Sequence, residues 1–357
     1  MKIKELLKIM VERNGSDIFF RAGGSPRIRV DARVEIIENT ILSVDDVMRA
    51  VEELTTPEQR ERFKRKLDID FAIYLPEFDR RFRVDIFMQR NWPSIVVRNI
   101  NNSIKSFEEL NLPFEVLRKL SMESRGLVLL TGSMGSGKST TIASMIEYIN
   151  VNAFKHVLTV EEPIEFTFKD KKSIINQREI SLDVESYAVA LRAFTLQSPD
   201  VMYISNIRDY ETMFAGMNAA ETGVLVLSTL HTVNASQSVE RIINFFQPHQ
   251  HQEMRNQLAQ LLKGVISLRL VPAKDGIGRI PAYEVMLLTP TISRLIREGK
   301  VWEIPQYIEE GAVYGMQSFN QSLIKLVREG KISEEDAMKT ADNKDEFVLA
   351  LKGIRKT

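Results

Sequence analysis

One ten-residue segment constrains the fold of this chain more than any other. Residues 132–141 read GSMGSGKSTT, which fits the pattern G-x-x-x-x-G-K-[ST] of a phosphate-binding loop. The preceding segment, 126–131, is short, apolar and β-prone, as expected of a buried strand. Residues 139–149 have helical periodicity. A strand, a glycine-rich loop and a helix in this order predict an α/β domain that binds phosphate groups at the loop.

The residue types in this loop predict which atoms meet a nucleotide. The glycines let the backbone turn its N–H groups toward phosphate oxygens, and the helix N-terminus adds partial positive charge. We expect Lys138 to reach the β- and γ-phosphates and Ser139 to coordinate Mg²⁺. The predicted nucleotide-binding residues are Ser133, Met134, Gly135, Ser136, Gly137, Lys138, Ser139 and Thr140. ATP and Mg²⁺ are therefore the expected cofactors.

Length and composition exclude several other classes of protein. At 357 residues the chain is too long for one typical domain. It contains no cysteine, which excludes disulfides and thiolate chemistry. The 48 Lys and Arg residues balance the 48 Asp and Glu residues, whereas a dedicated nucleic-acid-binding protein is usually basic. The charged N-terminus and the lack of an apolar run of about 18 residues predict neither a signal peptide nor a membrane span.

Residues 1–100 are predicted to form a small α/β module. Expected helices cover Ile3–Arg13, the segment from an N-cap at Ser43 to about Leu54, and Pro57–Lys64. Expected strands cover Pro26–Val30, Arg33–Ile37, Phe71–Tyr74, Arg81–Phe87 and Ser94–Arg98. Residues 101–112 are polar and turn-rich, and we interpret them as a linker.

Residues 113–357 are predicted to form the second domain. Its first half alternates strands and helices, which implies a parallel sheet with helices on both faces. The expected elements are strands Leu127–Thr131, His156–Val160, Val201–Ile204 and Gly223–Leu230, with helices at 138–150, 184–196 and 210–221. From about Val233 the chain is expected to be largely helical. The expected elements there are helices Ala235–Phe245, Gln250–Leu262, Thr291–Glu298, Glu303–Glu310, Met316–Glu329 and Ser333–Met338, with a strand pair at Arg269–Val271 and Ala282–Met286.

Several further segments, in order along nearly the whole chain, resemble the type IV pilus retraction ATPases, the PilT/PilU family of the secretion ATPase superfamily. The C-terminal part, from Gly315–Phe319 to Ala341-Asp342, is more similar to the PilU branch. The other matching segments are Gly15–Asp17, Arg29–Asp31, Arg81–Val84, an Asp box at Thr159–Phe166, Asn176–Glu179, a Walker B segment at Pro199–Asp209, Ala220–Gly223, a His box at Ser228–Thr232 and a retraction motif at Thr291–Glu298.

The resemblance implies a fold, a function and partners. The fold would be a PAS-like N-terminal module followed by a RecA-like ATPase core with a helical C-terminal part. The protein would form a hexameric ring at the cytoplasmic face of the inner membrane and use Mg-ATP to disassemble pili. Its partners would be the pilus platform protein and a paralogous retraction ATPase, with no nucleic acid.

The resemblance also assigns roles to residues outside the loop. Glu161 would position water and help to hold Mg²⁺, and His231 would sense the γ-phosphate. Arg81 and Arg83 would contact phosphate across a subunit boundary. Each residue also has an ordinary structural interpretation: a solvated helix cap for Glu161, a hydrogen-bonded loop residue for His231, and a solvated sheet face for the arginines.

The Walker B segment departs from the family pattern. The family normally reads close to GEMRD, whereas residues 205–209 read SNIRD, so Asn206 stands at the glutamate position. A side-chain amide holds water by hydrogen bonds but accepts no proton near neutral pH, and losing a catalytic base typically costs ~10²–10⁴ in rate. Three explanations stay open. In the first, Asn206 inactivates the enzyme and traps nucleotide; in the second, Glu161 or Glu165 replaces the missing base. In the third, positioning of water is enough, or the alignment of this segment with the family pattern is shifted.

Three rival functions follow. Asn206 and the PilU-like C-terminus favour a weakly hydrolysing accessory subunit of a retraction motor. An assembly ATPase is disfavoured because the long N-terminal extension and cysteine-based zinc site common in those relatives are missing from this sequence. A nucleic-acid-dependent ATPase is disfavoured by the balanced charge.

Overall fold

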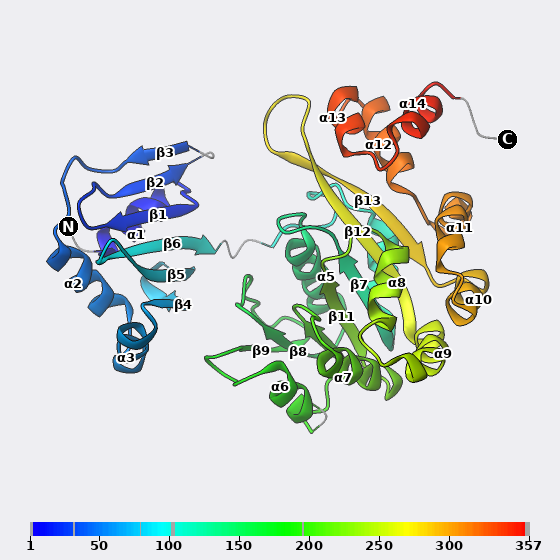
Figure 1. Cartoon of the computed structure of the whole chain (residues 1–357), viewed down its shortest axis with the longest axis horizontal. Coiled ribbons are helices and arrows are strands. Elements are labelled where there is room, and N and C mark those ends of the chain that lie inside the picture. The colour runs from blue at the N-terminus through cyan, green and yellow to red at the C-terminus, as the bar shows by residue number, and fades with distance from the viewer. Residues whose placement is uncertain (1–2, 31–32, 79, 101–103, 195, 354–357) are drawn as a thin grey trace. The chain divides into compact units, whose positions relative to one another are not determined.

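The computed structural model describes residues 3–30, 33–78, 80–100, 104–194 and 196–353 (Figure 1). Asp31, the last residue of one family-like segment, lies outside these ranges. The chain divides into two compact units. The first comprises Met1–Ser103 with Glu165–Thr167, and the second comprises Ile104–Ile164 with Phe168–Thr357. In the described part of the chain, no helix is both long and apolar enough to cross a membrane.

The first unit contains a six-stranded antiparallel sheet with the strand order β3-β2-β1-β6-β5-β4. Its strands are β1 Asp17–Arg21, β2 Arg27–Val30, β3 Arg33–Ile36, β4 Asp68–Leu75, β5 Arg80–Gln89 and β6 Trp92–Ile100. Its helices are α1 Ile3–Glu12, α2 Val44–Leu54 and α3 Pro57–Lys66, with a short 3₁₀ segment, η1 Pro76–Phe78. The predicted N-cap at Ser43 is confirmed: its side chain accepts from the Asp46 N–H in a capping box.

One face of this sheet is apolar and the other is charged. Along β5, Phe82, Val84 and Ile86 are fully buried and join one core with α1, α2 and α3. The alternate residues, including Arg81 and Arg83, are half-buried on the opposite face. Alternation of this kind is typical of an antiparallel sheet with one face in the core. Arg81 and Arg83 therefore share one face of β5.

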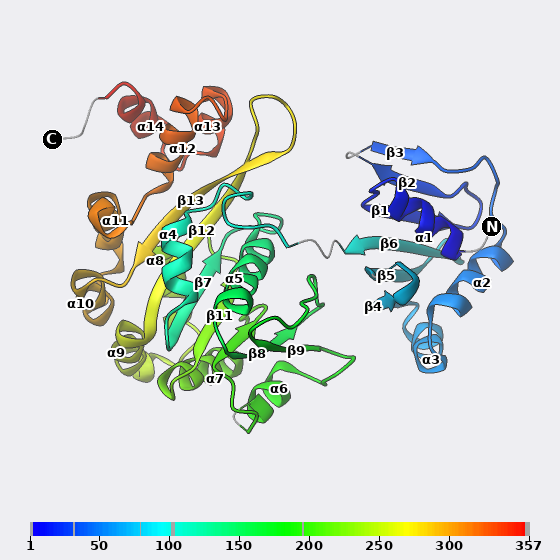
Figure 2. The ribbon, with the colours of Figure 1, turned by 180° about the vertical axis from the view of Figure 1, so that it is seen from behind.

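The second unit is built on a seven-stranded sheet with the order β13-β12-β7-β11-β10-β8-β9 (Figure 2). All neighbouring strands pair in parallel except β12 and β13, which pair antiparallel. The strands are β7 Gly126–Thr131, β8 His156–Glu161, β9 Ile174–Glu179, β10 Val201–Ile204, β11 Leu225–Leu230, β12 Leu262–Pro272 and β13 Arg279–Leu287.

Helices cover both faces of this sheet, as predicted. Alternate residues of β7 enter two different cores: Val128 and Leu130 pack with α5, whereas Leu127 and Leu129 pack with the layer that contains α7 and α8. All residues of β7 are therefore buried. The helices are α4 Phe114–Ser121, α5 Lys138–Asn152, α6 Tyr187–Phe194, α7 Tyr210–Glu221, α8 Ala235–Ile243, α9 His251–Leu261, α10 Pro290–Glu298, α11 Ile304–Glu310, α12 Phe319–Arg328, α13 Glu334–Thr340 and α14 Lys344–Leu351. Short 3₁₀ segments are η2 Pro248–Gln250, η3 Val301–Glu303 and η4 Gly311–Tyr314.

The C-terminal part is largely helical, as expected, but its predicted strand pair is longer than the sequence indicated. The pair exists, but β12 has 11 residues and β13 has 9, because β12 pairs with β7 of the central sheet and β13 pairs with β12. Figure 1 shows the pair reaching past the other strands to a separate helical layer. There α12, α13 and α14 pack on Val271 and Ala282 through a small apolar core.

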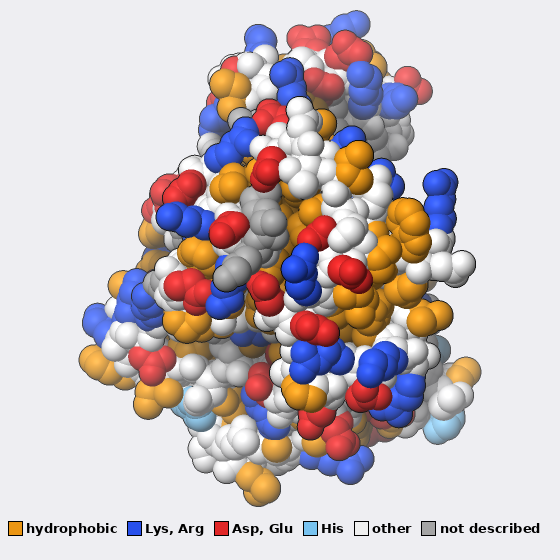
Figure 3. Space-filling model, turned by 90° about the vertical axis from the view of Figure 1, so that its left-hand side faces the viewer, with side chains coloured by type: hydrophobic (Ala, Val, Ile, Leu, Met, Phe, Trp, Pro, Cys, Tyr) orange, Lys and Arg blue, Asp and Glu red, His pale blue; other side chains and the backbone are white. Residues whose placement is uncertain are grey.

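Acidic and basic side chains are interspersed on the molecular face shown in Figure 3. This distribution matches the balanced composition of the sequence. A wide field of one sign, which would steer a nucleic acid, is not seen on that face.

Candidate nucleotide-binding site

The phosphate loop adopts a backbone that requires glycine. Gly132, Gly135 and Gly137 have φ angles of 142°, 74° and 96°, a region that residues with a Cβ rarely adopt. The loop also lies against β12, because a Cβ on Gly132 would stand 2.5 Å from the Leu268 carbonyl oxygen. A Cβ on Gly135 would meet no atom within 4 Å. The loop therefore turns tightly where it contacts the sheet and is open at its tip.

Two side chains of the loop present buried hydrogen-bond donors that suit an anion. The Lys138 ammonium is buried and donates to the carbonyl oxygens of Gly132 at 2.7 Å and Ser133 at 2.8 Å. The Ser136 hydroxyl is also buried, and among the described residues it has no hydrogen-bond partner. A buried hydroxyl without a partner is costly. Both groups therefore fit a ligand that carries phosphate oxygens.

The parallel strands bring distant segments to one edge of the sheet. β7, β11, β10 and β8 are consecutive neighbours, and their carboxyl ends lead to the phosphate loop, His231, Asn206 and Glu161 respectively. In open α/β sheets this edge is where ligands bind. Four of the segments that the sequence singled out therefore meet at the edge where Lys138 lies.

Asn206 and His231 form a direct contact at this edge. The Asn206 side-chain nitrogen lies 3.2 Å from Nε2 of His231. Because an amide nitrogen only donates, Nε2 accepts, and this hydrogen bond assigns the imidazole proton to Nδ1. Asn206 Oδ1 is buried and makes no hydrogen bond within the described residues. It is an available acceptor of the kind that a water molecule satisfies.

The surroundings of His231 favour its neutral form. Burial lowers the pKa of His231 from its usual value, and the positive charges of Lys138 and Arg208 lower it further. A neutral imidazole is what the contact with Asn206 needs, since Nε2 must accept. Arg208 itself forms an exposed ion pair with Glu162 at 3.5 Å.

Glu161 is a buried carboxylate held by neutral donors. Its Oε1 accepts from the Thr159 hydroxyl at 2.6 Å and from the Gln177 amide at 3.0 Å. The interpretation of Glu161 as a solvated helix cap is wrong, because its side chain is buried at the end of β8. Carboxylate and hydroxyl oxygens are ligands that Mg²⁺ prefers, so Glu161 and Ser139 suit the predicted metal chemically.

Two contributors to this edge were missed by sequence analysis. Gln177 comes from β9, a strand that was not predicted. The Tyr187 hydroxyl of α6 lies 2.7 Å from Oγ of Ser205, next to Asn206. Burial raises the pKa of Tyr187 to about 12, so the phenol stays protonated and can donate. Resemblance pointed to the segment around Gln177, but nothing in the sequence pointed to Tyr187.

Arg81 and Arg83 belong to the first unit rather than to this edge of the second. Arg83 forms a bidentate ion pair with Asp70, with Nε to Oδ1 at 2.9 Å and a further bond from Nη2 to Oδ2. This pair raises the pKa of Arg83. The structure therefore shows Arg83 on a charged sheet face, and its role in a subunit contact stays a prediction.

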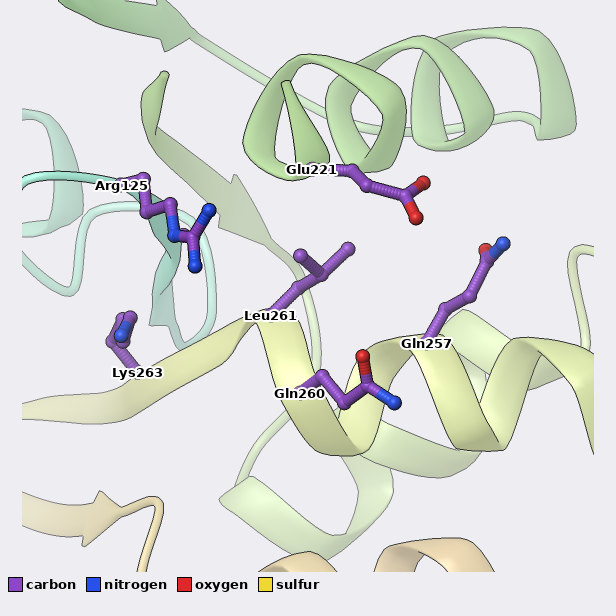
Figure 4. Close-up of a pocket in the computed structure, with 7 residues that line it drawn as sticks. Arg125, Glu221, Gln257, Gln260, Leu261 and Lys263 are labelled. Atoms are coloured by element: carbon purple, nitrogen blue, oxygen red, sulfur yellow. The ribbon is translucent and has the colours of Figure 1, made fainter. Parts of the chain in front are cut away.

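A cavity of about 170 Å³ lies at the opposite edge of the sheet (Figure 4). Its lining comes from the start of β7, the end of α7 and the junction of α9 with β12: Arg125, Gly126, Glu221, Gln257, Gln260, Leu261 and Lys263. It is smaller than the roughly 300–1,000 Å³ of typical ligand pockets, and no residue of the phosphate loop lines it. This cavity is therefore not the nucleotide site.

The comparisons with known proteins agree with this geometry. The profile of the family described as "Type II/IV secretion system protein" matches residues 1–339. The chain belongs to this family. The type IV pilus ATPase PilU of Pseudomonas aeruginosa is 41% identical over 352 residues, 99% of this chain and 92% of that protein. The retraction ATPase PilT of the same organism is 39% identical over 97% of this chain and all of that protein.

Solved structures share this fold. The crystal structure of the pilus retraction motor PilT with bound ADP matches with a TM-score of 0.91 and 38% identity, covering 97% of this chain and 98% of that one. The ATPase DotB of Legionella pneumophila matches with a TM-score of 0.79 at 24% identity, which supports the fold alone. The predicted α/β fold and the predicted family are both confirmed.

Proposed function

We propose that this protein binds Mg-ATP and hydrolyses it to power the retraction of type IV pili. The observation that carries the proposal is the meeting of the phosphate loop, Asn206, His231 and Glu161 at one sheet edge. The similarity of this chain to PilU and PilT over almost its whole length supports a role in pilus retraction.

The chain's own groups suggest how the phosphates are held. Lys138 and the loop N–H groups bind the β- and γ-phosphates, and the buried Ser136 hydroxyl donates to a phosphate oxygen. Ser139 would coordinate Mg²⁺ and Glu161 would hold it through a water, and the bound ion would neutralise phosphate charge. With Nε2 of His231 accepting from Asn206, its Nδ1–H is the donor available to the γ-phosphate.

Water activation is the unusual step. Asn206 Oδ1 is an available acceptor for a hydrogen bond from the attacking water. Neither the amide nor the occupied Nε2 of His231 takes a proton from that water. Glu161 is a buried carboxylate at this edge, and we propose it as the proton acceptor. If it does not act so, the chain is an accessory ATP-binding subunit, and Asn206 is the observation that favours this second function.

Steady-state Mg-ATPase activity tests the proposal. We expect the parent to exceed Lys138→Ala clearly, and Glu161→Gln to lower the rate by about 10²–10⁴. Asn206→Glu should raise the rate because it restores a second carboxylate. If the parent equals Lys138→Ala while Asn206→Glu turns over, the accessory function is correct. If Lys138→Ala still binds ATP like the parent, the site itself is assigned wrongly.

The assembly is part of the same proposal. We place a PAS-like domain at residues 1–100, a linker at 101–112 and a RecA-like domain at 113–357. Six subunits would form a ring at the cytoplasmic face of the inner membrane, with Arg81 and Arg83 contacting nucleotide in trans. The ring would act on the pilus platform protein, with a paralogous ATPase as a further partner. Sedimentation of the nucleotide-bound protein tests the hexamer.

A further inference from the structure

A buried polar row crosses three strands beside the phosphate loop. In the strand register, Thr131 of β7 lies opposite Ser267 of β12, and Ser267 lies opposite Glu284 of β13. The Thr131 hydroxyl donates to Oγ of Ser267 at 3.0 Å, and the Ser267 hydroxyl donates to Oε1 of Glu284 at 3.3 Å. All three side chains are buried. Because Thr131 directly precedes Gly132, the row begins where the loop begins.

The same carboxylate oxygen also holds the start of α8. The Ala235 N–H donates to Oε1 of Glu284 at 2.7 Å. Only residues 231–234 separate β11 from α8, and His231 is the first of them. The hydroxyl of Thr232, in this segment, lies 2.6 Å from the hydroxyl of Ser238 in α8. The His231 segment is therefore fixed by β11 at one end and by Glu284 at the other.

A carboxylate is a costly way to fill this position. Burial of a carboxyl disfavours its charged form, so an apolar side chain would serve the core alone better. The side chain instead joins two segments that are far apart in the sequence: the last residue before the phosphate loop and the first residue of α8. Both segments carry groups that face the proposed γ-phosphate position, namely Lys138 and His231.

We infer that Glu284 is a positioning residue that fixes His231 relative to the phosphate loop, so that a γ-phosphate held by the loop is within reach of His231. The inference rests on the proposed function and adds a residue outside its motifs. It predicts that Glu284 affects discrimination between ATP and ADP rather than nucleotide binding in general.

Two substitutions of similar size separate this role from simple packing. Glu284→Met removes the acceptor, whereas Glu284→Gln keeps an acceptor oxygen. The affinities of the purified protein for ADP and for the non-hydrolysable analogue AMP-PNP are measured for each. We expect Glu284→Met to lower the AMP-PNP preference over ADP about tenfold, with ADP affinity unchanged, and Glu284→Gln to stay within about twofold of the parent.

A double-substitution cycle tests whether the effect passes through His231. We expect Glu284→Met to add nothing once His231→Ala has removed the sensor. If Glu284→Met fails to fold, Ser267→Ala replaces it, with an expected loss of preference of about threefold. Ser322→Ala is the matched control, because this buried hydroxyl of α12 accepts from the N–H of Tyr283, the neighbour of Glu284, but has no place in the polar row. It should not change the preference.

The outcomes separate the inference from the proposed function. Equal losses of ADP and AMP-PNP affinity, or additive effects in the cycle, would overturn the role of Glu284. If His231→Ala itself leaves the preference unchanged, the sensor role in the proposed function fails, whatever Glu284 does. If His231→Ala lowers the preference but neither Glu284→Met nor Ser267→Ala does, the inference alone is wrong.

Discussion

The two sheets of this protein place their charged side chains differently. In the first unit, ionised groups pair with each other on the sheet face opposite the core: Arg83 with Asp70, which are both exposed, and Arg98 and Arg29 with the buried Asp17. In the second unit, two buried carboxylates accept hydrogen bonds from neutral donors. Glu161 accepts from Thr159, and Glu284 accepts from Ser267.

The difference teaches where a substitution should be costly. Exposed ion pairs contribute little because water already solvates both partners. Water cannot replace the lost partner of a buried group or relieve a close backbone contact, so such a substitution lowers the free energy of unfolding by its full cost. The predictions below test this contrast from the largest effect to the smallest.

Gly132→Ala should have the largest effect. The new Cβ would overlap the Leu268 carbonyl oxygen, and alanine would have to adopt a φ of 142°. The combined cost is expected to exceed about 3 kcal/mol, and nucleotide binding should be lost. Denaturant unfolding and nucleotide titration measure both. Gly135→Ala is the matched control for the contact alone, because Gly135 also has a positive φ, 74°, but its Cβ would meet open space. Equal losses in the two variants would contradict the contact with β12.

Glu284→Gln should reduce the pH dependence of stability. Burial raises the pKa of Glu284 from 4.5 to about 7, and the hydrogen bonds from Ala235 and Ser267 oppose the rise. The unfolded chain releases this proton near pH 4.5 and the folded chain near pH 7. The protonated Glu284 therefore contributes fully to the free energy of unfolding below pH 4.5, and this contribution is lost as the pH rises through 7. Between pH 5 and 8 the parent should lose about 3 kcal/mol more than the variant. The free energy of unfolding is measured by urea titration at each pH. If it depends on pH equally in the parent and the variant, this assignment is contradicted.

Arg83→Gln should have the smallest effect on stability. The side chains of Arg83 and Asp70 are 40% and 41% exposed, so losing their ion pair should cost under about 1 kcal/mol. Asp70→Asn should cost a similar amount. If Arg83 acts in trans on nucleotide, ATPase activity will fall by orders of magnitude in Arg83→Gln despite its stability. A stability loss well above 2 kcal/mol would show that the exposed pair is structural, against the contrast drawn here.

The sequence by itself determined the local elements and the family. The bounds of α2, α7 and β10 matched the prediction because their signals are local: the N-cap at Ser43 for α2, and short apolar or periodic runs for the others. The phosphate loop was recognisable because its glycines and Lys138 lie within one short segment of the sequence. The order of motifs was also enough to identify the family.

Only the tertiary structure decided which side chains meet. β9 was missed because half-buried strands at a sheet edge have weak patterning, and with it the contact of Gln177 with Glu161. Asn206 and His231 lie 25 residues apart, and Ala235 and Glu284 lie 49 apart. Such pairings follow from strand order and helix packing, whereas periodicity and spacing report only on neighbours within a few turns. The sequence was enough to locate the phosphate loop, whereas only the fold shows that hydrogen bonds through Ser267 connect its first end to Glu284.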